Sequence, residues 1–506
     1  MFRQRTTENI VINVGLGWFS RILGVITKVV LARLLFPSDF AIFAIATGLI
    51  GFVGTFGAFG LDYAIIQKGQ AATDEDYNVG MTLRLAIAVA LFAVSVFVAG
   101  PWASLFPKFS GLAVTSTTQI VALIYLVTPW SFVPTTRLTQ ELRYRTLAIP
   151  NLAGQIANAV ISIGLAVAGF SVWSLVYALL LSQVISTVGY VAVRGGRFRL
   201  ALRGAVARPL VAYSRHLIVA SLLAFLITNI DNFAVGRLLG PDALGYYAVA
   251  YGFGYLPVSL ISTPAGGALF PSLTRIQTRV EALRDAYLES FSYAAVLILP
   301  AGVGLSVMAS EIVHILLGPT WVAATVPLVV LGFYGIGRAL VDFSSSLFAA
   351  NGTPRIIARQ NFFILILSLI PLWPLTVYYS ISGTALSMTV PVLIVAVVSL
   401  AQSAKTVGAR FHDFAVRLKG PIAATTGMGA FLVALRLGLY AVLPSRLAIP
   451  ILSSNASVVT IVLLLGVPLG MVMYFLLLRL IDRDAYEGLM RHLRMVLRHG
   501  TRAQAR

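Results

Sequence analysis

Long apolar runs separated by short polar connections dominate the pattern of hydrophobic and polar positions along the chain. About 20 consecutive apolar residues cross a bilayer as a helix, and fourteen runs come close to that length. The predicted spans are 10–35, 41–65, 82–100, 115–135, 149–169, 173–193, 216–238, 245–270, 288–309, 323–349, 360–379, 384–402, 421–443 and 457–478. The first run is too long for the core of a signal peptide, so we expect it to be retained as a span. The pattern therefore predicts an all-α polytopic membrane protein with about 14 transmembrane helices.

Composition and charge favour a membrane protein over a nucleic-acid-binding protein. Of the 506 residues, 58% are hydrophobic and 11% are charged, and the mean hydropathy is +0.90. A soluble protein carries about 25% charged residues. The net charge of +19 is explained by Lys and Arg in cytoplasmic loops, so no nucleic-acid partner is expected. The chain contains no cysteine, which excludes disulfides, thiolate metal sites and cysteine nucleophiles.

The distribution of Lys and Arg predicts the orientation of the chain. With the N-terminus in the cytoplasm, 28 of the 37 Lys and Arg residues lie in cytoplasmic segments. Only 2, Lys108 and Arg446, lie in external segments, and the other seven lie within or at the edges of predicted spans. Because cytoplasmic loops of membrane proteins are enriched in Lys and Arg, this bias predicts that both termini are cytoplasmic.

An internal repeat organises the chain. Residues 33–46 read RLLFPSDFAIFAIA, residues 237–250 read RLLGPDALGYYAVA, and 6 of these 14 positions are identical at an offset of 204 residues. The copies begin at predicted helices 1 and 7 and so point the same way through the membrane, as in transporters built from parallel repeats. The expected parts are two parallel six-helix lobes at 1–203 and 204–412, two extra C-terminal helices at 413–480, and a basic cytoplasmic tail at 481–506 that lies along anionic membrane lipid.

Several short segments spread along nearly the whole chain carry a family resemblance. They are Phe19–Gly24 (FSRILG), Ala32–Pro37 (ARLLFP), Phe59–Leu61 (FGL), Asp231–Asn232, Gly240–Tyr246 (GPDALGY), Leu269–Arg275 (LFPSLTR) and Leu317–Trp321 (LGPTW). In this order and spacing they resemble the polysaccharide-transporter branch of the multidrug/oligosaccharidyl-lipid/polysaccharide flippase superfamily, the Wzx-like flippases.

The resemblance implies a carrier for undecaprenyl-pyrophosphate-linked oligosaccharides in the bacterial inner membrane. It would move repeat units for exopolysaccharide, capsule or O-antigen synthesis to the outer leaflet through a central cationic cavity that opens alternately to each side. A polysaccharide polymerase and a chain-length regulator are the expected protein partners. No cofactor is expected, and coupling to H⁺ or Na⁺ is left open. Related lipid II flippases have an arginine at the position of Arg21 and a second cation at the position of Thr27, which is followed here by Lys28.

Charged residues inside the predicted spans are the candidate site, because intramembrane charge is costly and marks function by default. Arg21 lies about 16 Å along the first helix, near the midplane, and Lys28 returns to nearly the same face. Gly17 and Gly24 share this face and leave room for a pyrophosphate, which the planar fork of an arginine can bind. We predict Arg21 and Lys28 as substrate-binding residues; the alternative is a structural ion pair with a carboxylate on a neighbouring helix.

Two further intramembrane charges are candidates. Asp231 is the most polar position of predicted helix 7 and corresponds to Thr27 across the repeat. It is predicted either to bind a coupling ion or to form a gate with Lys28 that closes the outer side in one state. Arg338 precedes Asp342 by four residues on one helix, and it is predicted either to pair with Asp342 or to be a further substrate-binding cation.

Other features are predicted to be structural. Arg33 and Arg237 correspond across the repeat at the ends of their helices, where a cation complements the helix dipole. Predicted helix 2 carries a glycine at every third position from Gly48 to Gly60, which favours close helix packing over bending.

The sequence gives no sign of an enzyme. The five histidines are dispersed, and no HExxH, GxSxG or P-loop motif occurs. A membrane-embedded polymerase or ligase should carry acidic or His/Arg clusters in large external loops, whereas the longest external loops predicted here have about 13 or 14 residues. The main alternative is a drug/cation antiporter of the same superfamily, which would have twelve helices and an acidic cavity. The excess of intramembrane cations favours the flippase.

Reporter fusions test the predicted orientation. A reporter that is active only in the periplasm should be silent when fused after residue 203 or 412, because both positions lie in basic, predicted cytoplasmic connections. A fusion after residue 446, in a predicted external connection, is the positive control. Periplasmic activity of either of the first two fusions would contradict the topology.

Overall fold

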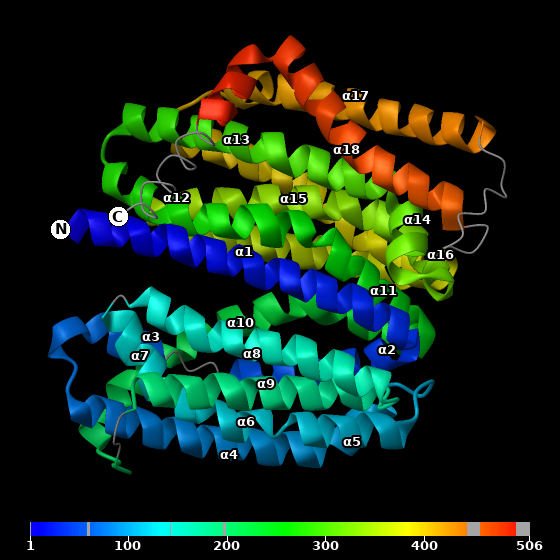
Figure 1. Cartoon of the computed structure of the whole chain (residues 1–506). Helices are drawn as coiled ribbons and strands as arrows, with labels where there is room; N and C mark the ends of the chain where they lie inside the picture. The colour runs from blue at the N-terminus through cyan, green and yellow to red at the C-terminus, as the bar shows by residue number, and fades with distance from the viewer. Residues whose placement is uncertain (1, 58–60, 142, 196–198, 443–455, 492–506) are drawn as a thin grey trace. The chain divides into compact units, whose positions relative to one another are not determined.

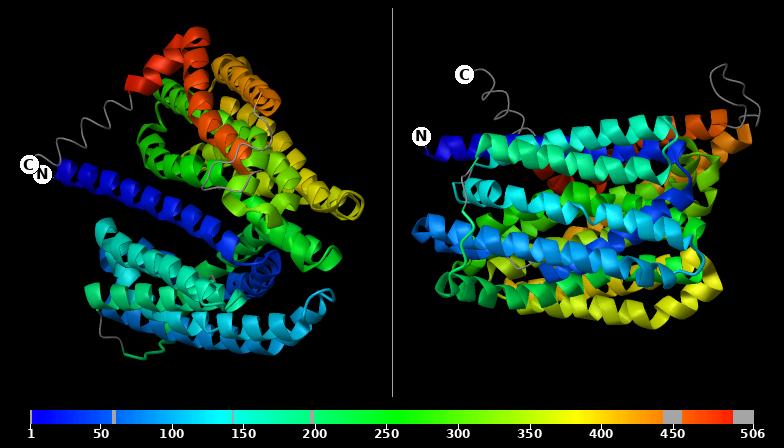
Figure 2. Two further views of the ribbon diagram at one scale, coloured as in Figure 1. Left: turned by 45° about the vertical axis from the view of Figure 1, so that its right-hand side comes forward. Right: turned by 90° about the horizontal axis from the view of Figure 1, so that it is seen from below.

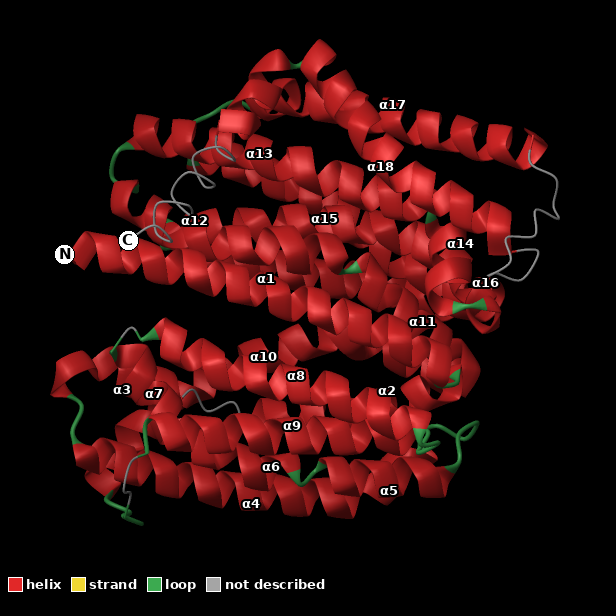
Figure 3. Cartoon of the chain, viewed as in Figure 1, coloured by secondary structure: helices red, strands yellow, loops and turns green. Residues whose placement is uncertain are grey.

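A computed structural model describes residues 2–57, 61–141, 143–195, 199–442 and 456–491. The regular secondary structure of these residues is helical (Figures 1 and 3). Contacts between residues divide the chain into two compact units, Met1–Gly245 and Tyr246–Arg506. Within each unit the long helices run side by side (Figure 2).

The first unit contains the helices α1 to α10 and the start of α11. Their bounds are α1 Phe2–Leu34, α2 Pro37–Gly57, α3 Leu61–Lys68, η1 Gly69–Ala71, α4 Asp74–Ser104, α5 Gly111–Val121, α6 Ile124–Val127, η2 Thr128–Ser131, α7 Phe132–Gln140, α8 Tyr144–Val167, α9 Val172–Val193, α10 Gly204–Leu238 and α11 Pro241–Gly254. The helix that opens the second predicted lobe, α10, packs against α2 and α4 of this unit. The predicted lobe boundary at 203/204 remains a prediction.

The second unit contains the remaining elements. Their bounds are η3 Val258–Ser262, α12 Thr263–Ile276, α13 Val280–Val307, α14 Ala309–Ile312, η4 Val313–Leu317, η5 Pro319–Ala324, α15 Thr325–Ala350, α16 Pro354–Thr406, α17 Phe411–Val442 and α18 Ala456–Ile481. The two predicted extra helices, α17 and α18, pack on each other and on α13. Tyr474 of α18 donates from its hydroxyl to the carbonyl of Val296 in α13, at 2.7 Å.

The predicted class, an all-α polytopic membrane protein, is confirmed, because twelve helices among the described residues are long and apolar enough to span a membrane. The predicted count of fourteen stays a prediction. One of the twelve, α16, covers two predicted spans, 360–379 and 384–402, and its backbone turns at Ser380. The seventh predicted span corresponds to α10, which is not among the twelve.

Two predicted spans are interrupted near prolines. The predicted span 115–135 is divided into α5, α6, η2 and α7, and Pro129 lies in the 3₁₀ segment η2. The predicted span 245–270 is divided into α11, the π-helical segment η3 and α12, with Pro257 at the break. Proline removes a backbone donor and clashes with the preceding turn. The length of an apolar run does not reveal such an interruption, because proline can lie within the run without shortening it.

Two predicted basic connections are largely helical instead. Residues 204–215 form the beginning of α10, and most of 405–419 continues α16 or begins α17. A helix does not end where the hydrocarbon ends, because its backbone hydrogen bonds are internal and persist in water. Apolar run length therefore underestimated these helices.

The glycines of α2 receive bulky side chains from neighbouring helices. A β-carbon at Gly48 would stand 2.8 Å from the ring of Phe233, and one at Gly51 would stand 2.7 Å from the ring of Phe225, both on α10. Gly54 and Gly57 similarly face other side chains of the unit, whereas Gly60 lies outside the described residues. This geometry supports close packing as the role of the glycine stripe.

A serine with a left-handed backbone turns one helical hairpin in each unit. Ser171, before α9, has φ 51° and ψ −134°, and Ser380, within α16, has φ 55° and ψ −147°. Non-glycine residues rarely adopt positive φ. The Ser171 hydroxyl donates to the carboxylate of Asp39, which also accepts a 2.9 Å bond from the backbone N–H of Phe36. The hairpin between α8 and α9 is thereby attached to the first turn of α2.

The helices α11 and α15 of the second unit approach at a pair of glycines. A β-carbon on Gly335 would stand 2.2 Å from the carbonyl oxygen of Gly254, closer than any real contact. Because the obstructing atom belongs to the backbone, the helices themselves would have to separate. This close approach positions the tyrosines and the arginine described below.

Alanine substitutions at two glycines test this packing. Gly335→Ala should lower the thermal stability of the purified protein, although glycine to alanine in a helix is normally stabilising by up to about 1 kcal/mol. Gly267→Ala in α12 is the matched control, since its β-carbon would meet nothing within 4 Å, and it should be neutral or stabilising. Equal melting temperatures for the two variants, measured in the same detergent, would contradict the proposed close approach.

Candidate functional site

The cationic face of α1 belongs to the first unit. Arg21 is half-buried, and its guanidinium extends back over Gly17, where a β-carbon would stand 3.3 Å from Nη1. A β-carbon on Gly24 would meet nothing within 4 Å. Among the described residues, neither Arg21 nor Lys28 forms an ion pair. The alternative of a structural pair for Arg21 therefore gains no support, and the face has room for an anion.

The gate proposed for Lys28 and Asp231 remains a prediction. Lys28 is half-buried on α1, whereas the side chain of Asp231 on α10 is fully buried and accepts a 2.8 Å bond from the backbone N–H of Asn232. Thr27, the neighbour of Lys28, returns its hydroxyl to the carbonyl of Leu23 at 2.8 Å. A gate would be made in one state of the transporter and broken in the other.

The helix-end arginines lie where the sequence places them. Arg33 and Arg237 are in the last turns of α1 and α10. Arg237 donates to the carbonyl of Leu105, just past α4, at 2.7 Å, and Lys108 donates to the carbonyl of Leu238 at 2.7 Å. These reciprocal contacts satisfy carbonyls at the ends of two helices. The role predicted for Arg33 and Arg237 at the ends of their own helices stays a prediction.

A cluster of one arginine, one carboxylate and three tyrosines lies in the second unit. Arg338 and Asp342 on α15 form the predicted i, i+4 pair, with Nη2 and Oδ1 2.9 Å apart. The pair does not use all of the guanidinium, because the buried Nη1 of Arg338 has no hydrogen-bond partner among the described residues. One side of the arginine fork is thus held by Asp342, and the other retains its donors.

Tyrosines from two helices complete this cluster. The hydroxyls of Tyr251 in α11 and Tyr334 in α15 are 2.9 Å apart. The ring of Tyr255 stacks on that of Tyr251 with centroids 6.1 Å apart, and Tyr255 lies close enough to Arg338 and Asp342 to interact electrostatically with both. Tyrosine rings offer flat apolar faces and polar hydroxyls, so the cluster could stack against a sugar while Arg338 donates to its oxygens.

Two features of the second unit were not predicted from the sequence: the place of Tyr255 in the cluster and an ion pair elsewhere in the unit. Tyr255 was not a candidate, although it follows Tyr251 by one helical turn. Arg436 had no assigned partner, yet its Nε lies 3.1 Å from Glu311, a carboxylate that is 0% exposed. An acidic residue directly after an apolar helix was the available signal for Glu311, but nothing in the sequence pairs it with a residue so distant along the chain.

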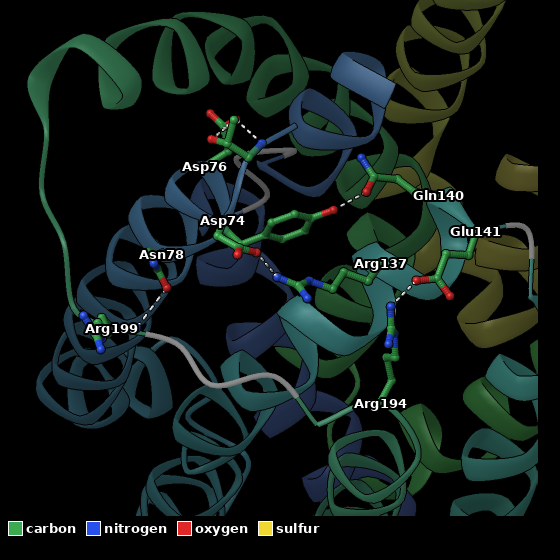
Figure 4. A network of polar contacts seen from close by, with 10 residues as sticks. Asp74, Asp76, Asn78, Arg137, Gln140, Glu141, Arg194 and Arg199 are labelled. Atoms are coloured by element: carbon green, nitrogen blue, oxygen red, sulfur yellow. Dashed lines mark hydrogen bonds and ion pairs between the residues drawn. The ribbon is translucent and has the colours of Figure 1, made fainter. Parts of the chain in front are cut away.

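A polar network joins three connections of the first unit (Figure 4). Arg137 of α7 lies 2.6 Å from Asp74 at the start of α4, and Arg194 after α9 pairs with Glu141. The backbone N–H of Arg199 donates to Asn78 at 2.9 Å. These contacts hold the ends of α4, α7 and α9 together.

The described residues contain no group of three or more His, Cys, Asp or Glu side chains that could hold a metal ion. What they offer instead is cationic donors within membrane-spanning helices and a tyrosine cluster. Such groups can bind an anion and a polar neutral ligand without altering either. The fold and the site together define a multi-spanning helical membrane transporter.

Solved structures share this fold. A lipid II flippase, MurJ, in an inward closed conformation matches with a TM-score of 0.73 at 15% identity, covering 94% of this chain and 99% of that one. An inward-facing multidrug resistance MATE family transporter of the MOP superfamily matches with a TM-score of 0.58 at 16% identity, covering 79% and 94%. The fold is therefore that of MOP-superfamily transporters.

Within this class, the chain belongs to the family described as polysaccharide biosynthesis protein, whose family model matches residues 30–326. Relatives include the succinoglycan biosynthesis transport protein ExoT of Rhizobium meliloti, at 26% identity over 62% of this chain and 63% of that protein. The lipopolysaccharide biosynthesis protein WzxC of Escherichia coli is 23% identical over 67% and 69%. An uncharacterized membrane protein in the cps region of Klebsiella pneumoniae is 26% identical over 73% and 76%. The predicted relation to Wzx-like polysaccharide transporters is confirmed.

A double-mutant comparison separates a structural from a ligand-binding role for Arg338. Arg338→Met and Asp342→Leu should each destabilise the protein, because each leaves a partly buried charge without its partner. The double variant should recover thermal stability. If Arg338 contacts the substrate, transport should nevertheless stay lost in the double variant. Recovery of both stability and polymer export would assign Arg338 to the ion pair alone.

Proposed function

We propose that the chain is a flippase that moves undecaprenyl-pyrophosphate-linked oligosaccharide repeat units from the cytoplasmic to the outer leaflet of the bacterial inner membrane. Membership of the polysaccharide biosynthesis protein family and the likeness to WzxC support the pathway. The transport functions named for ExoT and MurJ support the step. The repeat units would serve exopolysaccharide, capsule or O-antigen synthesis. A polymerase and a chain-length regulator would act on the exported units.

The observation that carries the proposal is Arg21 on a face of α1 that has no ion pair among the described residues. A guanidinium within a membrane-spanning helix is costly to retain without a function. Its fork of donors matches the oxygens of a pyrophosphate, and the open space at Gly24 leaves access to it. Lys28 would provide the second cation for the same anion.

The second unit would recognise the glycan. Arg338 retains donors on one side of its fork, and Tyr251 and Tyr255 provide a stacked aromatic pair nearby. A neutral oligosaccharide needs hydrogen bonds and flat apolar contacts rather than net charge. A drug/cation antiporter would instead need an unpaired carboxylate for its cargo, whereas Asp342 is held by Arg338.

The chain is proposed to work by alternating access, with no chemical change in the substrate. The Lys28–Asp231 gate would contribute only through its different stability in the two states. Coupling to H⁺ or Na⁺ would place Asp231 at the ion site. We propose no catalytic residue.

Substitution of Arg21 tests the function. In a strain that lacks the chromosomal copy, Arg21→Ala should abolish polymer export and cause lipid-linked repeat units to accumulate in the cytoplasmic leaflet. Arg21→Lys should rescue export only in part, because an ammonium keeps the charge but loses the bidentate fork. The reason for both effects is the loss of phosphate binding rather than of folding.

Arg33→Ala is the matched control, since Arg33 lies on the same helix but is exposed in its last turn. It should reach the membrane in the same amount as Arg21→Ala and should export polymer. Normal export by Arg21→Ala, or equal loss in both variants at equal abundance, would refute the assignment of Arg21.

A further inference from the structure

An apolar groove lies on the first unit between the interrupted segment α6–η2 and the second half of α9, which are neighbours in the fold (Figure 1). It has a volume of about 490 Å³. Leu126 and Trp130 line one side, and Val184, Val188 and Val191 line the other. Pro129 turns the chain into a 3₁₀ segment here, which is narrower than an α-helix, and the valines of α9 are too short to fill the space.

One polar side chain belongs to this apolar lining. Thr187 lines the groove and is 5% exposed, and its Oγ1 has no hydrogen-bond partner among the described residues. Thr118 and Thr136, two other buried helical threonines of this unit, return their hydroxyls to the carbonyl four residues earlier at 2.7 Å, whereas the buried Thr117, like Thr187, has no hydrogen-bond partner among the described residues. A buried hydroxyl without a partner costs about 1–3 kcal/mol. An acceptor atom of a bound molecule would remove that cost.

A cationic residue follows the last residue of α9 that lines the groove: Arg194 comes two residues after Ala192. Arg194 follows Thr187 by two helical turns, about 10.5 Å along the axis. The carboxylate of Glu141 pairs with Arg194 (Figure 4). It also pairs with Arg143, whose Nη1 lies 3.7 Å from Oε2. Two arginines on one carboxylate leave a net positive charge. The buried Nε of Arg194 also lacks a hydrogen-bond partner among the described residues.

We propose that this groove binds one anionic glycerophospholipid. An acyl chain would fill the apolar lining, an ester carbonyl would accept a hydrogen bond from Thr187, and the phosphate would lie at Arg194 and Arg143. The hydrocarbon core and the headgroup layer of a bilayer lie in this order along a spanning helix. The separation of Thr187 and Arg194 is one that the ester and phosphate of a single lipid span, given the length of an arginine side chain.

The two unsatisfied donors select among lipids. A prenyl phosphate has an anionic head but no ester oxygen for Thr187. A phosphatidylcholine has the ester but no net charge to balance Arg194 and Arg143. An anionic glycerophospholipid supplies both, so the site is distinct from the proposed substrate site and does not depend on it. A bound chain would also support the segment in which Pro129 interrupts the helix.

Native mass spectrometry of the full chain tests the proposal. The delipidated protein is incubated separately with phosphatidylglycerol, with phosphatidylcholine of the same chain length and with undecaprenyl phosphate. We expect one phosphatidylglycerol to survive collisional activation preferentially. Thr187→Val, which keeps the shape but removes the hydroxyl, should lower its retention about fivefold, the effect of one lost hydrogen bond. Retention of undecaprenyl phosphate, which offers no ester oxygen to Thr187, should not change.

A matched pair of tryptophan variants places the lipid in the groove. Val188→Trp fills the groove, whereas Ile149→Trp adds the same bulk to α8. Val188 is 61% exposed and Ile149 is 55% exposed. Ile149 lies five residues after the start of α8, and Val188 lies five residues before the end of α9. These two helix ends are neighbours, because the Tyr190 hydroxyl donates to the Leu147 carbonyl at 3.2 Å. Only Val188→Trp should lose the retained phosphatidylglycerol.

Several outcomes would overturn the proposal. Equal retention by the two tryptophan variants would show that the groove does not hold the lipid. Preferential retention of undecaprenyl phosphate, unaffected by Thr187→Val, would assign the groove to a prenyl chain. A dimer that Val188→Trp dissociates would assign it to a second copy of the chain. If Val188→Trp fails to fold, the Thr187→Val comparison decides, because full retention in that variant contradicts the proposed hydrogen bond.

Discussion

The cost of placing charge in a hydrocarbon environment constrains this molecule more than any other interaction. Several charged side chains in or beside the long helices have protein partners: Arg237 and Lys108 bind carbonyls at helix ends, and Arg436 pairs with the buried Glu311. Such contacts offset desolvation without adding much net stability. Against this background, Arg21 stands out because it forms no ion pair among the described residues. The second side of Arg338 stands out because its buried Nη1 has no hydrogen-bond partner among them.

Close backbone packing determines where these donors lie. Gly335 and Gly254 allow α15 and α11 to approach to backbone contact, which brings the hydroxyls of Tyr334 and Tyr251 together and places Arg338 one turn from Tyr334 on α15. On α1, the absence of a side chain at Gly17 gives the Arg21 guanidinium its position. In the membrane, helix association depends on such packing because lipid is as apolar as the side chains. Small residues thus position the polar groups, although they contact no ligand themselves.

The sequence predicted those features that depend on short stretches of chain. Apolar run length located nearly every spanning helix, and i, i+4 spacing predicted the Arg338–Asp342 pair, because both signals are local. It did not predict the interruption at Pro129, since a proline in an apolar run can either kink a helix or end it. The Tyr251–Tyr334 contact and the Glu311–Arg436 pair join residues far apart in the chain, so only the packed helices reveal them.

The two copies of the internal repeat share residues at the ends of their helices but differ in the charged residues at the helix centres. Arg33 and Pro37 recur as Arg237 and Pro241, and the strained serines Ser171 and Ser380 turn hairpins at nearly the same separation. At the repeat offset, however, Arg21 corresponds to Phe225 and Lys28 to Asn232.

The ends of the helices are thus preserved while their centres diverge. A symmetric pair of sites would suit a symmetric cargo. A lipid-linked oligosaccharide has an anionic pyrophosphate at one end and a largely neutral glycan at the other, so it gains most from two unlike sites. A duplicated fold that carries such a cargo would need its two copies to differ. Here α1 has a cationic face where α10 is aromatic, and the tyrosine cluster lies on α11 and α15.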